Sequence, residues 1–178
     1  MAEESKNEIM EATYEALCKH GYADLTIEKI SHESEKGKSL IYYHFDDKEA
    51  LILEFLDFMV EDLEEEFEHL EGEGEKKVEQ VPDLLLTENT DMQDFHKALI
   101  DIQGRAQFNP DLAEKFGDID ELIKSELLEG LEKMDLDDPD FKAEFFLSTI
   151  QGTLSRRLTY NEEIDLEEVK EELMASIR

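Results

Sequence analysis

Five side chains that can bind phosphate or the edges of bases lie within a short stretch near the N-terminus. They are three lysines and two histidines: His32, Lys36, Lys38, His44 and Lys48. Nothing in the chain indicates catalysis, since it has no nucleophile elbow, H-E-x-x-H, Walker loop or G-x-G-x-x-G. The histidines also lack the spacing of a metal site. These residues therefore favour binding, and we expect no enzyme, no cofactor and no metal.

Two short helices must position these side chains. Thr26 is a good N-cap because its hydroxyl can accept a hydrogen bond from an amide of the first turn, and apolar residues follow at helical spacing. Polar residues 34–36 interrupt this helix. A second segment begins near Gly37, carries L-I-Y-Y-H-F, and ends at two aspartates. Helix, tight turn and helix is the order of a helix-turn-helix DNA reader.

In such a reader the second helix faces the groove of DNA, which would bring Lys38, Ser39 and Leu40 to the bases. Lysine reaches guanine acceptors or phosphate, serine can bond either, and an apolar tip can contact a thymine methyl. Leu40 could equally be buried. By spacing, Ile41 and Phe45 are predicted to be core.

The run H-G-Y-A-D-L-T-I-E-K-I-S, followed by L-I-Y-Y-H-F-D-D-K-E-A-L, resembles the N-terminal DNA-binding domain of the tetracycline-repressor (TetR/AcrR) family of transcriptional regulators. The match covers about residues 9–53. The resemblance implies that four side chains hold the DNA backbone, with Tyr42 the better phosphate donor of the two tyrosines: Tyr42, Tyr43, His44 and Lys48. Thr26 then has two possible roles, as helix cap and as phosphate contact.

The turn between the two helices departs from the family pattern. Ser34 and Glu35 replace the usual small residue and glycine, and Lys36 replaces a common apolar residue. A left-handed Glu35 would cost about 1–2 kcal/mol relative to glycine. We therefore expect a shifted turn geometry, with Lys36 as a further candidate for DNA contact.

The charge of the chain is unusual for a DNA-binding protein. Forty-nine acids against eighteen bases give a formal net charge of −31, where a basic patch is expected. Either the chain does not bind DNA, or the acids are a surface adaptation to a cytoplasm of very high salt, as in halophilic organisms, where the Debye length is about 3 Å at 1 M. The distribution favours the second, because residues 1–50 carry only twelve acids beside six bases.

Amphipathic patterns continue to the C-terminus and predict an all-α protein of about nine helices. Besides the reading pair we expect helices at about residues 5–20, 48–70, 78–86, 92–108, 110–131, 141–160 and 165–177. No apolar run is long enough to span a membrane, and the N-terminus lacks a signal peptide, so we expect a cytoplasmic protein. A single cysteine, Cys18, excludes an internal disulfide.

The resemblance also implies two domains, a helix-turn-helix domain at residues 1–50 and a helical effector-binding and dimerisation domain at residues 51–178. The last two helices would form an intersubunit four-helix bundle, and Leu154 and Leu173 are predicted to lie in it. Aromatic and apolar side chains with one polar group favour a hydrophobic effector. The candidates to line its cavity are Phe55, Phe58, Met59, Phe95, Leu99, Gln103, Phe108 and Phe146.

The sequence therefore predicts a ligand-responsive repressor that binds a palindromic operator in double-stranded DNA as a homodimer. One alternative is a regulator of the same fold that activates or does not respond to a small molecule. A third class, an acidic helical interaction module that never binds DNA, rests on the net charge alone.

Overall fold

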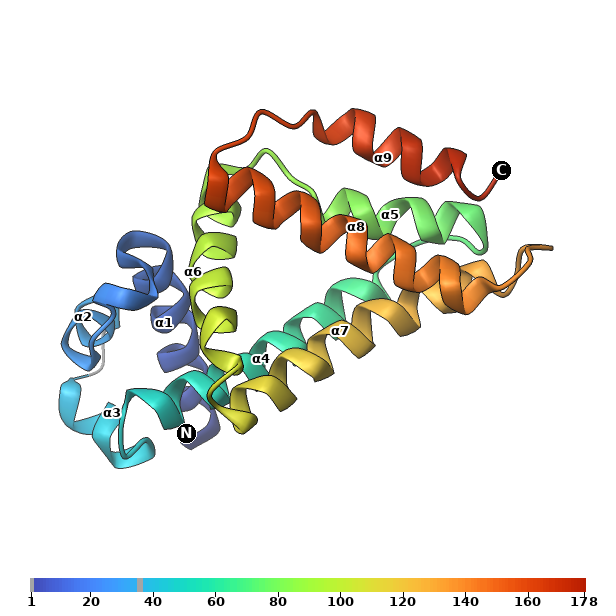
Figure 1. Cartoon of the computed structure of the whole chain (residues 1–178). Coiled ribbons are helices and arrows are strands. Elements are labelled where there is room, and N and C mark those ends of the chain that lie inside the picture. Colours follow the sequence, from blue (N-terminus) through green and yellow to red (C-terminus); the bar gives the residue numbers. More distant parts are fainter. Residues whose placement is uncertain (1, 35–36) are drawn as a thin grey trace. The chain divides into compact units, whose positions relative to one another are not determined.

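The computed structural model describes residues 2–34 and 37–178, and within them the chain forms nine helices and no strand (Figure 1). The predicted all-α class is therefore confirmed. No helix of the described residues is long and apolar enough to cross a membrane. The helices are α1 (Ala2–Asp24), α2 (Ile27–Glu33), α3 (Lys38–His44), α4 (Lys48–Glu68), α5 (Glu75–Leu85), α6 (Thr90–Ala106), α7 (Pro110–Leu131), α8 (Pro139–Tyr160) and α9 (Leu166–Ala175).

Local signals in the sequence set most of these boundaries. At Gly21 the backbone of α1 leaves the helical region, with φ 67° and ψ 168°, which is a conformation that glycine adopts without a Cβ clash. Asn89 and Asp165 cap α6 and α9, since each side chain accepts two amide hydrogen bonds. The start of α5 differs from the prediction in a way that matters, because this helix begins at Glu75 and so has Pro82 in its interior rather than in its first turns.

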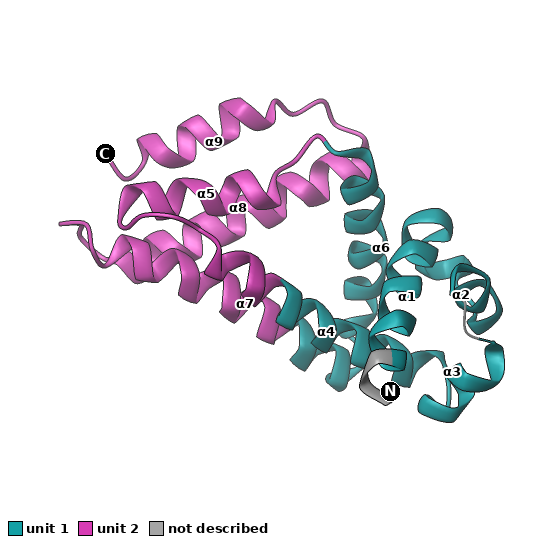
Figure 2. Ribbon diagram, turned by 180° about the vertical axis from the view of Figure 1, so that it is seen from behind, with its two compact units in different colours: residues 1–62, 89–116 teal, residues 63–88, 117–178 magenta. Residues whose placement is uncertain are grey.

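The chain divides into two compact units (Figure 2). Unit 1 consists of Met1–Asp62 and Asn89–Phe116, and unit 2 of Leu63–Glu88 and Gly117–Arg178. In unit 1, α6 packs along α1, and the ring of Phe95 lies 4.6 Å from that of Tyr14 and 6.1 Å from that of Phe55. By packing, α6 thus belongs with the N-terminal helices, although it lies beyond the predicted domain boundary at residue 50.

Unit 2 is held by an apolar core with ion pairs at its edge. Phe146, Val78, Leu127 and other side chains of α5, α7, α8 and α9 are buried together. Gly130 permits the close approach of α5 and α7, because a Cβ there would lie 2.7 Å from the Val78 side chain. Beside it, the Lys77 ammonium lies 2.7 Å from Glu126 and 2.8 Å from Glu129.

Candidate nucleic-acid interface

Caps and buried anchors fix the two short helices that carry the predicted DNA contacts. The Thr26 hydroxyl accepts a hydrogen bond from the Lys29 amide at 3.2 Å, which confirms its role as a cap. Helix α3 begins directly after Gly37, where the sequence predicted it. Ile41 is fully buried and Phe45 is 5% exposed, as expected for core positions. These two buried side chains anchor α3 within unit 1.

The outer side of α3 presents polar and aromatic groups to solvent. Lys38 and Ser39 are exposed, and Leu40 is partly buried. Tyr43 is 80% exposed and Tyr42 50%, so the tyrosine predicted to be the better phosphate donor is the less accessible one. The Lys38 ammonium lies 5.8 Å from the centroid of the Tyr42 ring. A hydroxyl-bearing ring and a cation therefore share one helix face.

Two further predicted contacts fall at the edges of this surface. The His44 ring is half-buried and packs edge-on against Tyr43, with the ring centroids 5.2 Å apart. Lys36, together with Glu35 of the unusual turn, lies outside the described residues.

Lys48 has its polar partners inside the protein. Its ammonium donates to the carbonyl oxygens of Tyr22 at 2.9 Å and Leu25 at 3.0 Å, and lies 4.0 Å from the centroid of the Tyr22 ring. Burial, followed by the nearby Arg105 charge, lowers the pKa of Lys48. The half-buried ammonium therefore binds the end of α1, whereas the resemblance implied a contact with DNA phosphate.

The start of α4 has an acidic side chain on one of its amides. The carboxylate of Asp47 accepts a hydrogen bond from the Ala50 amide at 2.9 Å. Asp46 and Asp47 are both exposed. An acid therefore occupies one of the amides that a phosphate could have used at this helix end.

The eight side chains predicted to line an effector cavity lie in different environments. Phe55 and Phe95 are buried against one another in unit 1, whereas Phe146 is fully buried in the core of unit 2. Phe108 is 84% exposed, which is the exposure of a surface side chain and not of a cavity lining. The other four are the half-buried Phe58, Met59 and Leu99 and the exposed Gln103.

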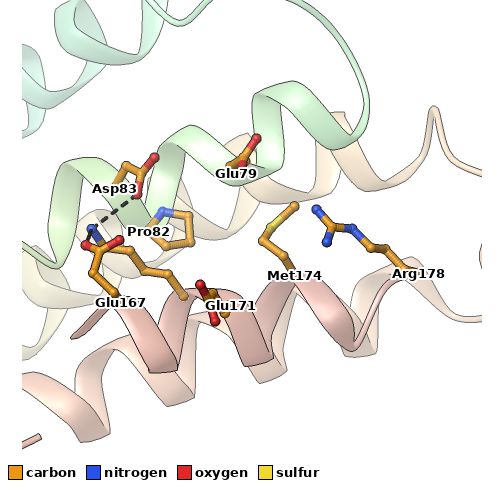
Figure 3. A pocket seen from close by; sticks show the side chains of 8 residues that line it. Glu79, Pro82, Asp83, Glu167, Glu171, Met174 and Arg178 are labelled. Carbon is orange, nitrogen blue, oxygen red and sulfur yellow. Dashed lines mark hydrogen bonds and ion pairs between the residues drawn. The ribbon is translucent and has the colours of Figure 1, made fainter. Parts of the chain in front are cut away.

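Two hollows in unit 2 are lined by other residues. The first is a polar pocket between α5 and α9 (Figure 3), with a volume of about 430 Å³. At its edge the Lys170 ammonium lies 3.2 Å from the Asp83 carboxylate. The second is an open groove of about 660 Å³ along α8 and α9 that includes Phe145, Val169 and Leu173. Neither contains a side chain predicted to contact the effector.

Two residues with unusual surroundings carry no signal in the sequence. The Nδ1 atom of His96 on α6 is buried without a hydrogen-bond partner among the described residues, and burial lowers the pKa of this imidazole. Arg105, in the last turn of α6, places its guanidinium carbon 4.8 Å from the centroid of the Tyr22 ring. Both features depend on tertiary packing, so periodicity could not reveal them.

A helix-turn-helix pair with an exposed second helix, followed by an all-helical body, is the architecture of a DNA-binding regulator. Residues 9–55 match the model of the family described as "Bacterial regulatory proteins, tetR family". An HTH-type transcriptional repressor AcnR from Corynebacterium efficiens is 27% identical, over 98% of this chain and 93% of that protein.

Solved structures give the same result. A TetR transcription regulator from Haloarcula marismortui superposes with a TM-score of 0.85 at 26% identity, covering 98% of this chain and 96% of that one. The regulator FadR from Bacillus subtilis, solved in complex with stearoyl-CoA, shares the fold at 17% identity with a TM-score of 0.65, over 96% of each chain. The family-model match, the repressor relative and the solved structures together support a DNA-binding transcriptional regulator of the TetR family.

Proposed function

We propose that the chain is a ligand-responsive repressor that acts as a homodimer on a palindromic operator in the cytoplasm. The observation that carries this proposal is the solvent-facing side of α3, where Lys38, Ser39 and Tyr43 are all exposed in a family of DNA-binding regulators. The repressor function of the AcnR relative supports repression over activation.

Base recognition is assigned to Lys38, Ser39 and the partly buried Leu40 at the start of α3. Lysine and serine offer donors to base acceptors in the major groove, and the leucine tip offers an apolar contact. The DNA backbone contacts are assigned to Tyr42, Tyr43, His44 and Thr26, with Lys36 as a further candidate in the turn. Such contacts fix register without choosing sequence.

A second copy of this chain is the proposed partner of the outer face of α8. Phe141 is 64% exposed and Phe145 42%, and the small residues Ser148 and Gly152 are exposed on the same helix face. Exposed apolar surface next to small residues favours close helix packing. Leu173 is a poor choice to test this, because it is 2% exposed and belongs to the core of its own unit.

The proposed effector is an apolar molecule that carries at least one hydrogen-bonding group. The half-buried side chains Phe58, Met59 and Leu99 supply the apolar surface in unit 1. His96, three residues before Leu99 on α6, supplies the buried Nδ1 that has no hydrogen-bond partner among the described residues. A buried polar atom without a partner costs about 1–3 kcal/mol, so a ligand that pairs with it would bind with a gain.

We propose that this acidic chain needs high salt both to fold and to bind DNA. Several bases are already shared between two acids, as Lys170 is between Asp83 and Glu167, and the acids of the chain outnumber its lysines and arginines by 31. Mutual repulsion of these charges opposes both folding and approach to DNA. Dissolved potassium would weaken both effects by screening.

A gel-shift titration with the DNA upstream of the chain's own coding region, in molar potassium chloride, tests the proposed function. We expect a discrete protein–DNA complex. Dissociation of this complex on addition of a long-chain acyl compound would identify the effector class. Binding that no apolar ligand alters favours a regulator without a small-molecule effector. No complex at any salt concentration, with the fold intact, favours the acidic interaction module.

A further inference from the structure

We propose that Lys48, Tyr22 and Arg105 form a positioning cluster, the Tyr22 cluster, which sets the DNA affinity of α2 and α3 without touching DNA. Three helices meet there, because Tyr22 lies near the end of α1, Lys48 begins α4, and Arg105 lies in the last turn of α6. The inference rests on the DNA binding by α3 proposed above.

The contacts of Lys48 fix the segment that leads into the reading helices. Its two carbonyl partners, at Tyr22 and Leu25, bracket the connection between α1 and α2. Carbonyls at a helix end lack intrahelical donors, so a cation that binds them stabilises that end. Thr26, the N-cap of α2, follows directly. Lys48 therefore holds the origin of the helix-turn-helix in place.

A phosphate would have to compete with these partners for Lys48. Two hydrogen bonds of about 3 Å and a ring at 4.0 Å already surround the ammonium, and a lysine has only three donors. Drawing the side chain to DNA would take this donor away from both carbonyls, of which the Tyr22 carbonyl would keep only the Leu25 amide at 3.2 Å. The internal partners thus account for the position of Lys48 without any contact to DNA.

Arg105 extends the cluster to α6. Its guanidinium lies within the range at which an aromatic ring attracts a cation. Two cations, from α4 and α6, therefore lie next to the Tyr22 ring. A second link lies nearby, since the Asn109 side chain donates to the Glu49 carboxylate at the start of α4. Any shift of the last turn of α6 therefore changes the surroundings of both Tyr22 and Lys48.

The two roles of a lysine predict different salt behaviour. A lysine that contacts DNA displaces counterions from it, and its removal makes the signed slope of log affinity against log salt more positive by about 0.9. A lysine that orders the protein changes the affinity at every salt concentration but leaves this slope as it was. The slope thus separates positioning from direct contact.

The test compares Lys48→Met with the matched control Lys38→Met, an exposed cation on α3. Operator affinity is measured across potassium chloride concentrations at which circular dichroism shows each variant to be folded. Amide exchange of residues 22–27 is measured without DNA. For Lys48→Met we expect about tenfold weaker binding, an unchanged slope and faster exchange. For Lys38→Met we expect a slope more positive by about 0.9 and unchanged exchange.

A second pair of variants isolates the ring. Tyr22→Phe keeps the ring and should retain wild-type exchange, whereas Tyr22→Leu removes it and should speed exchange in the same segment, as should Arg105→Gln to a smaller degree. The proposal is overturned if Lys48→Met shifts the slope upward as Lys38→Met does and leaves exchange unchanged. Amide exchange is measured without DNA, so it tests the Tyr22 cluster even if DNA binding fails. A wild-type chain that binds no operator would overturn the proposed function and not the contacts of the cluster.

Discussion

Helices α3 and α8 both leave aromatic rings in solvent, but the groups beside those rings differ. On α3 the exposed rings are tyrosines, at 50% and 80% exposure, next to Lys38. On α8 two of them are phenylalanines, at 64% and 42%, next to the exposed Ser148 and Gly152. A phenol with a cation can bind a phosphate, whereas a phenyl ring beside small residues can only pack.

The difference shows that exposure alone does not identify a partner. Acidic residues lie next to both surfaces. The groove along α8 and α9 includes Glu168 and Glu172, and Asp46 and Asp47 follow α3 in the sequence. Both surfaces therefore meet electrostatic resistance, against DNA in one case and against a second acidic copy in the other. Chemistry and salt together decide what each surface binds.

The largest effect should come from salt, which acts on both surfaces at once. Raising potassium chloride from low concentration toward the molar range should increase the stability of the fold and raise operator affinity by about an order of magnitude or more. Screening removes long-range repulsion before it weakens short contacts. Circular dichroism beside each DNA titration keeps loss of fold apart from loss of contact. A chain fully folded at low salt, whose affinity falls steadily as salt is added, would contradict this.

The next effect should be confined to α8. Phe145→Glu buries a carboxylate from each copy in the proposed dimer, at a cost of about 3–5 kcal/mol for an unpaired buried charge. We expect folded monomers, because this ring is 42% exposed within its own unit. Light scattering in molar potassium chloride provides the measurement, with Glu144→Gln, an exposed neighbour on α8, as the control. A wild-type monomer at micromolar concentration would defeat the assignment.

Changes on α3 should be smaller and of two kinds. Tyr43→Phe or His44→Ala should weaken binding to all DNA by about 1 kcal/mol, since each removes one contact to the backbone. Lys38→Ala or Ser39→Ala should instead alter base preference. Selection from a random DNA pool measures both. If the two latter variants return the wild-type site, α3 does not read the bases.

Local patterns were sufficient to predict the reading helices. The start of α3 after Gly37, the Thr26 cap and the burial of Ile41 and Phe45 follow from caps and periodicity, which depend only on near neighbours in the chain. The all-helical body and most helix boundaries followed from the same signals. The start of α5 did not, because an acidic, glycine-containing loop precedes it without a side-chain cap.

Contacts between distant residues could not be predicted in this way. Lys48 has the right type and offset for a phosphate clamp, but its partners lie at Tyr22 and Leu25, more than twenty residues earlier. The packing of α6 along α1, and with it the position of Arg105, likewise depends on the tertiary fold. A residue type at a given spacing predicts what a side chain can bind but not which of several partners it finds.

The smallest effect should come from His96, which lies on α6 and belongs to neither the α3 surface nor the α8 surface. Burial lowers the pKa of this imidazole from its ordinary 6.5, so below pH 6.5 the unfolded chain takes up a proton that the folded chain does not. Its contribution to stability is therefore lost as pH falls from about 6.5 toward the lower pKa of the folded state.

His96→Leu should remove this part of the pH dependence and stabilise the fold by about 1 kcal/mol, because no buried nitrogen is then left unpaired. Urea unfolding at pH 7.5 and pH 5.5, in the same molar potassium chloride, measures both effects. The many carboxylates also titrate with pH, so only the difference between variants is informative. The control is His32→Leu, at an exposed position on α2, which keeps the His96 contribution. If both variants lose stability equally on acidification, the His96 ring is not held neutral by burial.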